Sequence, residues 1–181
     1  HHSVGMIVEV EMLEKVADSI YHIDISNTLG KRFNLCPEEA FSDQPSVGIG
    51  TTFLIGTDTF VTAHHVFERP ITEYLVVFGF ETISRNNTVE SFIHESRVFE
   101  IEKLYTEISD IELDIAFFGL KDSVDFLPLK RGESLENKNH DEIYCIGNPS
   151  GLPTKISVNA DILESDHPTY IYTSLDAFQG N

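Results

Sequence analysis

The sequence predicts an all-β protein with two small barrels, the second of them incomplete, and an amphipathic helix before the first barrel. Short runs of β-branched and aromatic residues, separated by turn-forming residues, predict the barrels. One segment near the start instead has apolar residues at helical spacing. With 181 residues, thirteen of them Phe, the chain is long enough to bury a core. Its longest apolar run, Tyr74 to Phe80, is too short to span a bilayer, so no membrane anchor is expected.

The N-terminal part of the chain divides into two segments. Residues 1–6 begin with two histidines and resemble the remnant of an affinity tag, so they are set aside from the fold. Residues 7–46 contain the helix and a polar lead-in. The helix is predicted over Glu9–Ile23, with its apolar side chains at i, i+3, i+4 and i+7 in Leu13, Val16, Ala17 and Ile20. This helix would be a docking element for a partner protein.

The rest of the chain is predicted to form strands. Residues 47–120 make the first barrel, with strand candidates Gly48–Ile55, Thr59–Thr62, Tyr74–Phe80, Arg97–Leu104 and Asp114–Leu120. A charged connector with Pro128 and Gly132 occupies residues 121–141. Residues 142–181 form the first part of a second barrel, with strand candidates Glu142–Gly147, Lys155–Leu163 and Thr169–Leu175.

The composition limits the classes of partner. Thirty acidic against twelve basic side chains give a formal net charge of −18, which opposes phosphate binding, so nucleic acid is not expected as a partner. The charge would attract basic peptides, although an acidic surface more often serves solubility. The sparse cysteines, Cys36 and Cys145, favour a cytoplasmic location and leave a secreted or periplasmic one open. No metal-binding motif is present, so neither a metal nor another cofactor is expected.

Three places in the chain carry residues suited to chemistry. His64 and His65 follow a strand that ends in a small residue, so the turn should present one of them at a barrel rim. Asp114 heads an apolar strand, where a carboxylate needs compensation that an imidazole N–H supplies. The chain closes on Gln179-Gly180-Asn181, whose glycine permits an unusual backbone conformation.

These residues and several further stretches resemble the bacterial trypsin-like peptidases with Gly-Asn-Ser-Gly motifs, which are distantly related to glutamyl endopeptidases and chymotrypsin. The stretches that carry the resemblance are Leu35–Pro45, Gly50–Gly56, Thr62–His65, Asp114–Ala116, Gly147–Lys155 and Gln179–Asn181. The departures are Thr52, where many members have glycine, and His64, where a small residue is usual. The resemblance implies a chymotrypsin-like double β-barrel and a serine endopeptidase that hydrolyses peptide bonds through an acyl-enzyme.

The resemblance also implies roles for individual residues. Its pattern Thr-Ala-x-His selects His65 as the general base and leaves His64 as a neighbour. Asp114 would orient His65, and the N–H of Gly180 would form part of the oxyanion hole. The nucleophilic serine would follow Asn181, so the 181-residue chain alone is expected to be inactive.

Two residues before that serine are expected to bind substrate. Asp176 lies six positions before it, where the resemblance suggests cleavage after Arg or Lys, and a purely structural role is the alternative. Gln179 lies in the run-up to the nucleophile.

Two other interpretations compete with a serine endopeptidase whose nucleophile follows Asn181. Ser150 follows His65 and Asp114 in an acceptable order, but Pro149 before it has no N–H and the run Pro-Ser-Gly is typical of a turn. The second reading is a non-catalytic protease homologue that binds a peptide or protein in its cleft. The residue after Asn181 decides this case, because a serine there favours the enzyme.

Overall fold

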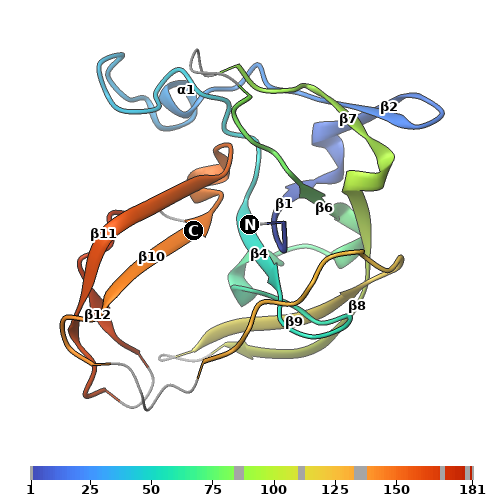
Figure 1. Ribbon diagram of the computed structural model, residues 1–181. Coiled ribbons are helices and arrows are strands. Elements are labelled where there is room, and N and C mark those ends of the chain that lie inside the picture. Colours follow the sequence, from blue (N-terminus) through green and yellow to red (C-terminus); the bar gives the residue numbers. More distant parts are fainter. Residues whose placement is uncertain are drawn as a thin grey trace.

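The computed structural model describes residues 2–83, 88–109, 113–132, 138–167, 170–177 and 180. Figure 1 shows a closed barrel with a separate three-stranded sheet, β10-β11-β12, beside it. The short helix α1 (Leu29–Phe33) and the small sheet β2-β3-β7 lie on opposite sides of the upper end in this view. All strand pairs are antiparallel. The predicted all-β fold is confirmed.

Six strands close the barrel in the order β1-β4-β5-β9-β8-β6. They are β1 Val4–Glu9, β4 Gly50–Leu54, β5 Phe60–Thr62, β6 Tyr74–Phe78, β8 Val98–Ser109 and β9 Asp114–Leu120. The last five match the strands predicted for the first barrel. Because the ladder closes on itself, both edges of the sheet are paired.

Aromatic side chains fill the barrel on the side that supports the candidate site. Phe60, Phe78 and Phe118 are at most 2% exposed. The rings of Phe60 and Phe118 stack with centroids 5.6 Å apart, and Phe67 meets Phe118 edge-on at 5.5 Å. Burying a side chain of this size stabilises the fold by about 1.5–3 kcal/mol. The chain segment of His64–Phe67 therefore rests on a well-packed floor.

Strand β1 begins within the first six residues, at Val4, so these residues belong to the fold. Setting residues 1–6 aside from the fold is wrong, because Val4 and Met6 are buried in the barrel at 7% and 0% exposure. Gly5 lies opposite both Thr52 of β4 and Phe78 of β6, so β1 joins these two strands and closes the barrel. The barrel therefore includes a strand that lies before residue 47.

The predicted helix over Glu9–Ile23 is also wrong. The segment forms the end of β1, a 3₁₀ turn over Val10–Met12, and a hairpin of β2 (Leu13–Ala17) and β3 (Ile20–Ile23). β7 (Phe92–His94), which the sequence did not predict, pairs with β3. The described N-terminal residues thus contain no docking helix of the kind expected for a partner protein.

The physical reason is competition between a weak local preference and tertiary pairing. Asp18 and Ser19 favour a chain reversal between the two halves of the predicted helix. Val16 and Ile20 have a higher preference for strands than for helices. In the structure Val16 is 48% exposed, so the apolar residues at helical spacing do not form one buried face.

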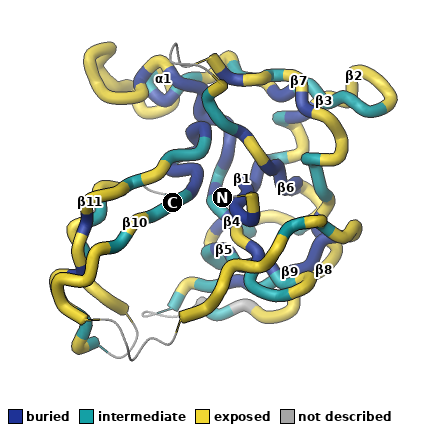
Figure 2. The backbone as a smooth tube through the Cα atoms, viewed as in Figure 1, coloured by how far each residue is buried: buried dark blue, intermediate teal, exposed yellow. Residues whose placement is uncertain are grey.

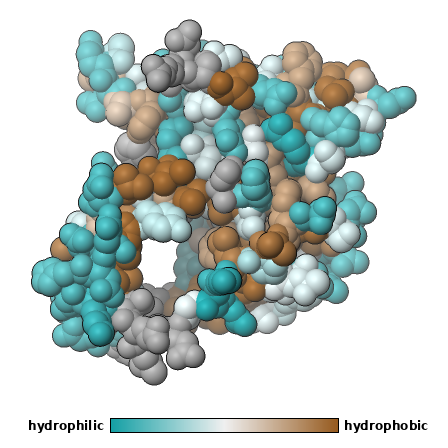
Figure 3. Space-filling view, viewed as in Figure 1, coloured by the Kyte–Doolittle hydropathy of each residue, from teal (hydrophilic) through white to brown (hydrophobic). Residues whose placement is uncertain are grey.

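The second sheet is open and has the order β10-β11-β12. Its strands are β10 Glu142–Gly147, β11 Lys155–Glu164 and β12 Tyr172–Thr173, and the connector before it has neither helix nor strand over residues 121–132 and 138–141. Exposed residues dominate β11, whereas β1 and β6 are buried (Figure 2). The space-filling view shows an open gap between this sheet and the barrel (Figure 3). Over the described ranges, no helix combines the length and apolar character that crossing a membrane requires.

The barrel and the second sheet meet at a close crossing of two glycines. The N–H groups of Val47 and Gly48 donate to the carbonyl of Gly151 at 2.9 and 3.3 Å. Gly151 has a φ of +71°, and a Cβ on it would lie 2.2 Å from the carbonyl oxygen of Gly48. Only glycine fits such a contact. The crossing holds the 3₁₀ turn η6 (Pro149–Gly151) beside β4.

Candidate active site

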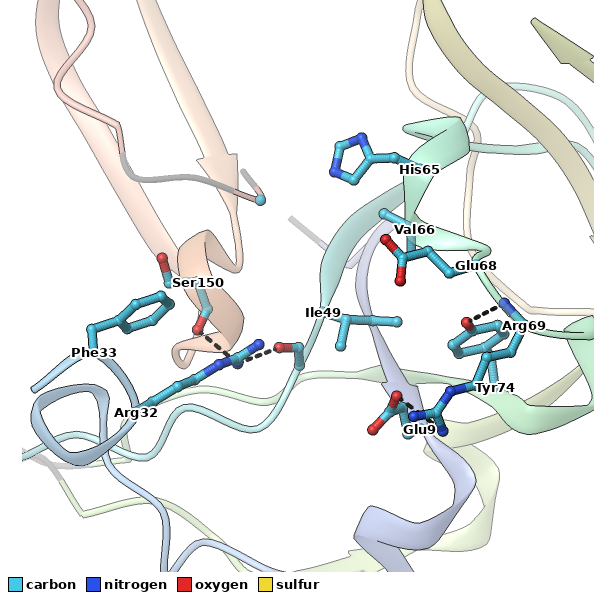
Figure 4. Close-up of a pocket in the computed structure, with 12 residues that line it drawn as sticks. Glu9, Arg32, Phe33, Ile49, His65, Val66, Glu68, Arg69, Tyr74 and Ser150 are labelled. Atoms are coloured by element: carbon cyan, nitrogen blue, oxygen red, sulfur yellow. Dashed lines mark hydrogen bonds and ion pairs between the residues drawn. The ribbon is translucent and has the colours of Figure 1, made fainter. Parts of the chain in front are cut away.

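A short turn places His65 at the rim of the barrel. β5 ends at Thr62, and Ala63 precedes the 3₁₀ turn η2 (His64–Val66). Val66 is 5% exposed and packs against Gly50, where a Cβ would lie 2.7 Å from the Cγ2 of Val66. Because Val66 points inward, the ring of His65 projects from the turn into a pocket (Figure 4).

Asp114 holds His65 through two contacts. It is the first residue of β9, which pairs with β5 through Thr62 and Ala116, so its side chain lies next to η2. Its Oδ1 accepts a hydrogen bond from the backbone N–H of His65 at 2.9 Å, and its Oδ2 contacts the Nδ1 of the His65 ring. The predicted pairing of His65 with Asp114 is present in the structure.

The electrostatics of this pair fix which ring nitrogen can act. The hydrogen bond from the His65 ring is the main cause that lowers the pKa of Asp114 below its usual value, and the backbone N–H groups of His65 and His64 add to it against partial burial. An ionised Asp114 favours the proton on Nδ1 of His65. No hydrogen bond from a described residue occupies Nε2, which is therefore the nitrogen able to accept a proton.

The pair is more exposed than the sequence suggested. The side chains of His65 and Asp114 are 58% and 44% exposed, whereas an acid at the head of an apolar strand was expected to be buried. The expectation failed because burial begins two residues later in β9, at Ala116, which is fully buried. Solvent therefore reaches Asp114 in this structure.

Gly180 lies in the same pocket as His65. Its φ of +82° is a conformation that favours glycine. The hydroxyl of Thr51 on β4 donates to the carbonyl of Gly180 at 3.0 Å and accepts the N–H of Asn148 at 2.9 Å. Thr51 thus ties Gly180 to the barrel beside His65. Gln179 and Asn181 lie outside the described residues, so the substrate-binding role of Gln179 stays a prediction.

The comparisons with known proteins identify the family of the chain. The model of the trypsin-like peptidase domain matches residues 50–181. The chain belongs to the trypsin-like peptidase family. A comparison with curated protein sequences finds no match.

Two solved protease structures share the fold of this trypsin-like peptidase. The Vibrio cholerae VesB protease has a TM-score of 0.54 and 14% identity, over 93% of this chain and 45% of that one. The inactive form of the Rv3671c protease has a TM-score of 0.54 and 17% identity, over 99% of this chain and 68% of that one. The chain thus spans less than half of the first protease and about two thirds of the second.

Asp176 of the trypsin-like peptidase lies apart from His65. Its exposed side chain lines a separate hollow of about 330 Å³, together with Lys155 and Pro149. Ser150, the next residue of η6, lines the pocket of His65 instead, so η6 separates the two spaces. Burial lowers the pKa of Lys155 to about 8, and its Nζ donates to a backbone carbonyl at 2.7 Å. Asp176 therefore shares its hollow with an ammonium group.

The structure also shows where the hydroxyl and thiol groups weighed as other nucleophiles lie. Ser150 lies across the pocket from His65 (Figure 4) and has a φ of +51° in η6, as expected of a turn. Cys145 is half-buried and Cys36 is exposed, and neither lines the pocket of His65. Among the described residues, no group of three His, Cys, Asp or Glu side chains is placed to hold a metal ion.

The pocket of His65 also contains residues that the sequence did not indicate. It has a volume of about 360 Å³ and is lined by Glu9, Arg32, Phe33, Gly48, Ile49, His65, Val66, Glu68, Arg69, Tyr74, Ser150 and Gly180. Glu9 and Arg32 were assigned to a helix and a lead-in, far along the chain from His65. No pattern in the sequence connects them to it, because the barrel and α1 bring them together only in the folded chain.

Proposed function

We propose that the whole protein is a serine endopeptidase that hydrolyses peptide bonds through an acyl-enzyme. The contact of Asp114 with Nδ1 of His65 carries this proposal, because it prepares a base whose Nε2 points into a pocket. Gly180, tied to Thr51 in the same pocket, supports it. Membership of the trypsin-like peptidase family supports proteins or peptides as the class of substrate.

In the proposed reaction the nucleophile is a serine that follows Asn181. Its oxygen attacks the peptide carbonyl while Nε2 of His65 takes the hydroxyl proton, and Asp114 stabilises the imidazolium that results. The N–H of Gly180 and that of the serine stabilise the negative oxygen of the tetrahedral intermediate. His65 then protonates the leaving amine as the carbon–nitrogen bond breaks, and water hydrolyses the acyl-enzyme by the same steps.

Replacing His65 tests this proposal in a chain that extends past Asn181. We expect His65→Ala to lower kcat/KM on fluorogenic peptides by about 10⁴-fold or more, because the base is lost. His64→Ala is the matched control and should leave kcat/KM nearly unchanged, since the backbone N–H of His64 that contacts Asp114 is kept in alanine. Unchanged turnover in His65→Ala would reject the mechanism, and no turnover in the unaltered extended chain would favour a non-catalytic peptide-binding homologue.

We further propose that Asp176 selects substrates cleaved after Arg or Lys. Its carboxylate lines a hollow beside η6, close in the chain to Gly180. We expect kcat/KM for Arg-terminated substrates to exceed that for Leu-terminated ones by about tenfold, and Asp176→Asn to remove the difference. A preference for Glu-terminated substrates would contradict this proposal and would point to the ammonium of Lys155 in the same hollow.

A further inference from the structure

The pocket of His65 combines an apolar floor with a charged rim. Ile49, Val66 and Tyr74 form the floor, and Val66 and Tyr74 are at most 5% exposed. Charged side chains surround it: Glu68 lies near His65, Glu9 and Arg69 lie together, and Arg32 lies on the far side beside Ser150 (Figure 4). This arrangement suits a long side chain that has an apolar stem and a charged end.

Glu68 is the acidic group in this pocket for which the described residues supply no partner. It comes three residues after His65, and its carboxylate points toward the pocket in Figure 4. It has neither a hydrogen bond nor an ion pair to any residue that the structure describes. A carboxylate in this position can accept hydrogen bonds from a cation without breaking an existing contact.

The other charges of the pocket are already engaged. Arg69 Nη1 lies 3.3 Å from Glu9 and 3.6 Å from Glu73, so two carboxylates share its positive charge. The Nη1 of Arg32 donates to the carbonyl of Gly48 at 2.9 Å and to the hydroxyl of Ser46 at 3.1 Å. These bonds hold α1 against the segment before β4. Glu68 is therefore the charge best placed to meet a substrate next to His65.

We propose that this pocket is a second specificity site that takes a lysine or arginine side chain of the substrate, with Glu68 as its anion. The inference rests on the proposed peptidase function, because it places the pocket beside the cleaved bond. The side chain bound here belongs to a different substrate residue from the one that enters the hollow of Asp176, since η6 separates the two spaces.

Peptide binding to the 181-residue chain tests this proposal without requiring the nucleophile. The probes are three capped pentapeptides of alanine and glycine with a central lysine, norleucine or glutamate. Binding is followed by NMR at the backbone amides of Ile49, Val66 and Glu68, and shifts at Asp176 would report the other hollow. We expect the lysine peptide to bind about two- to fivefold tighter than the norleucine peptide, and salt to reduce the difference.

Two variants identify the group responsible. Glu68→Gln should make the lysine and norleucine peptides bind equally. Glu73→Gln, which removes a nearby carboxylate that does not line the pocket, should keep the preference. The proposal would be overturned if the unaltered chain binds the three peptides equally or binds the glutamate peptide most tightly. It would also be overturned if the preference for lysine survives Glu68→Gln, or if the three pocket amides do not shift. Because no cleavage is measured, these results stand apart from the His65→Ala assay.

Discussion

At the scale of single residues, the position of His65 depends on two atoms of one carboxylate. Oδ1 of Asp114 fixes the backbone of η2, and Oδ2 fixes the ring that η2 carries. A substitution of Asp114 therefore changes both the turn and the imidazole. The two contacts also lower the pKa of Asp114, which links the stability of the fold to pH.

The sign of this link follows from the direction of the pKa change. The pKa of Asp114 is lower in the folded chain than its ordinary value of 3.8, so its stabilising contribution is complete above that value and is lost as the pH falls through the lowered pKa. The contribution is about 1 kcal/mol or less, because the side chain is 44% exposed and solvent screens it. The free energies of unfolding of the unaltered chain and of Asp114→Asn, measured in urea, should therefore differ most above pH 3.8, and the difference should shrink as the pH falls below that value.

A matched variant separates this effect from general acid unfolding. Asp161 is exposed on β11, and its carboxylate accepts no hydrogen bond from a described residue. Asp161→Asn should therefore change the unfolding free energy by an amount that does not vary with pH. If the difference for Asp114→Asn is equally independent of pH, the contact with His65 does not stabilise the folded chain.

At the scale of elements, the sequence predicted the strands that carry the site and missed the segment that completes the pocket. β5, β9 and β10 match their predicted runs within a residue or two, because turn-forming residues bound them on both sides. β12 is shorter than its predicted run. The prediction of a helix over Glu9–Ile23 failed because a spacing of three to four residues over so few positions also fits two short strands and a turn.

The site residues that could be predicted from the sequence are those next to strands that could be predicted. His65 and Asp114 each adjoin a well-marked strand, and their pairing follows from the order of the strands. The other pocket residues come from distant segments: Glu68 follows η2, Arg32 lies in α1, and Glu9 ends β1. No local pattern in the sequence links these segments. These residues meet only because the barrel closes and because Gly48 crosses Gly151. They can therefore be recognised as one pocket only in the folded chain.

At the scale of the whole molecule, the barrel is a closed sheet and the sheet β10-β11-β12 is an open one. The barrel buries the side chains of β1 and β6 on a closed ladder, whereas the second sheet leaves Tyr144, Ile156 and Val158 at 68%, 59% and 55% exposure. Apolar side chains left this exposed add little burial to the second sheet. The stability of the 181-residue chain therefore depends mainly on the barrel, and the barrel depends on β1.

Two alanine substitutions test this dependence on β1. Ile7 is fully buried and lies between Gly50 of β4 and Val76 of β6, so Ile7→Ala should lower the free energy of unfolding by about 2–5 kcal/mol through lost burial and a cavity. Val16 is 48% exposed, and Val16→Ala should change it by about 0.5 kcal/mol or less. Urea unfolding followed by circular dichroism measures both. A helix over Glu9–Ile23 would reverse the order, because Val16 would then lie on its packed face and Ile7 would precede the helix. An equal, small effect of both substitutions would show that β1 does not close the barrel in solution.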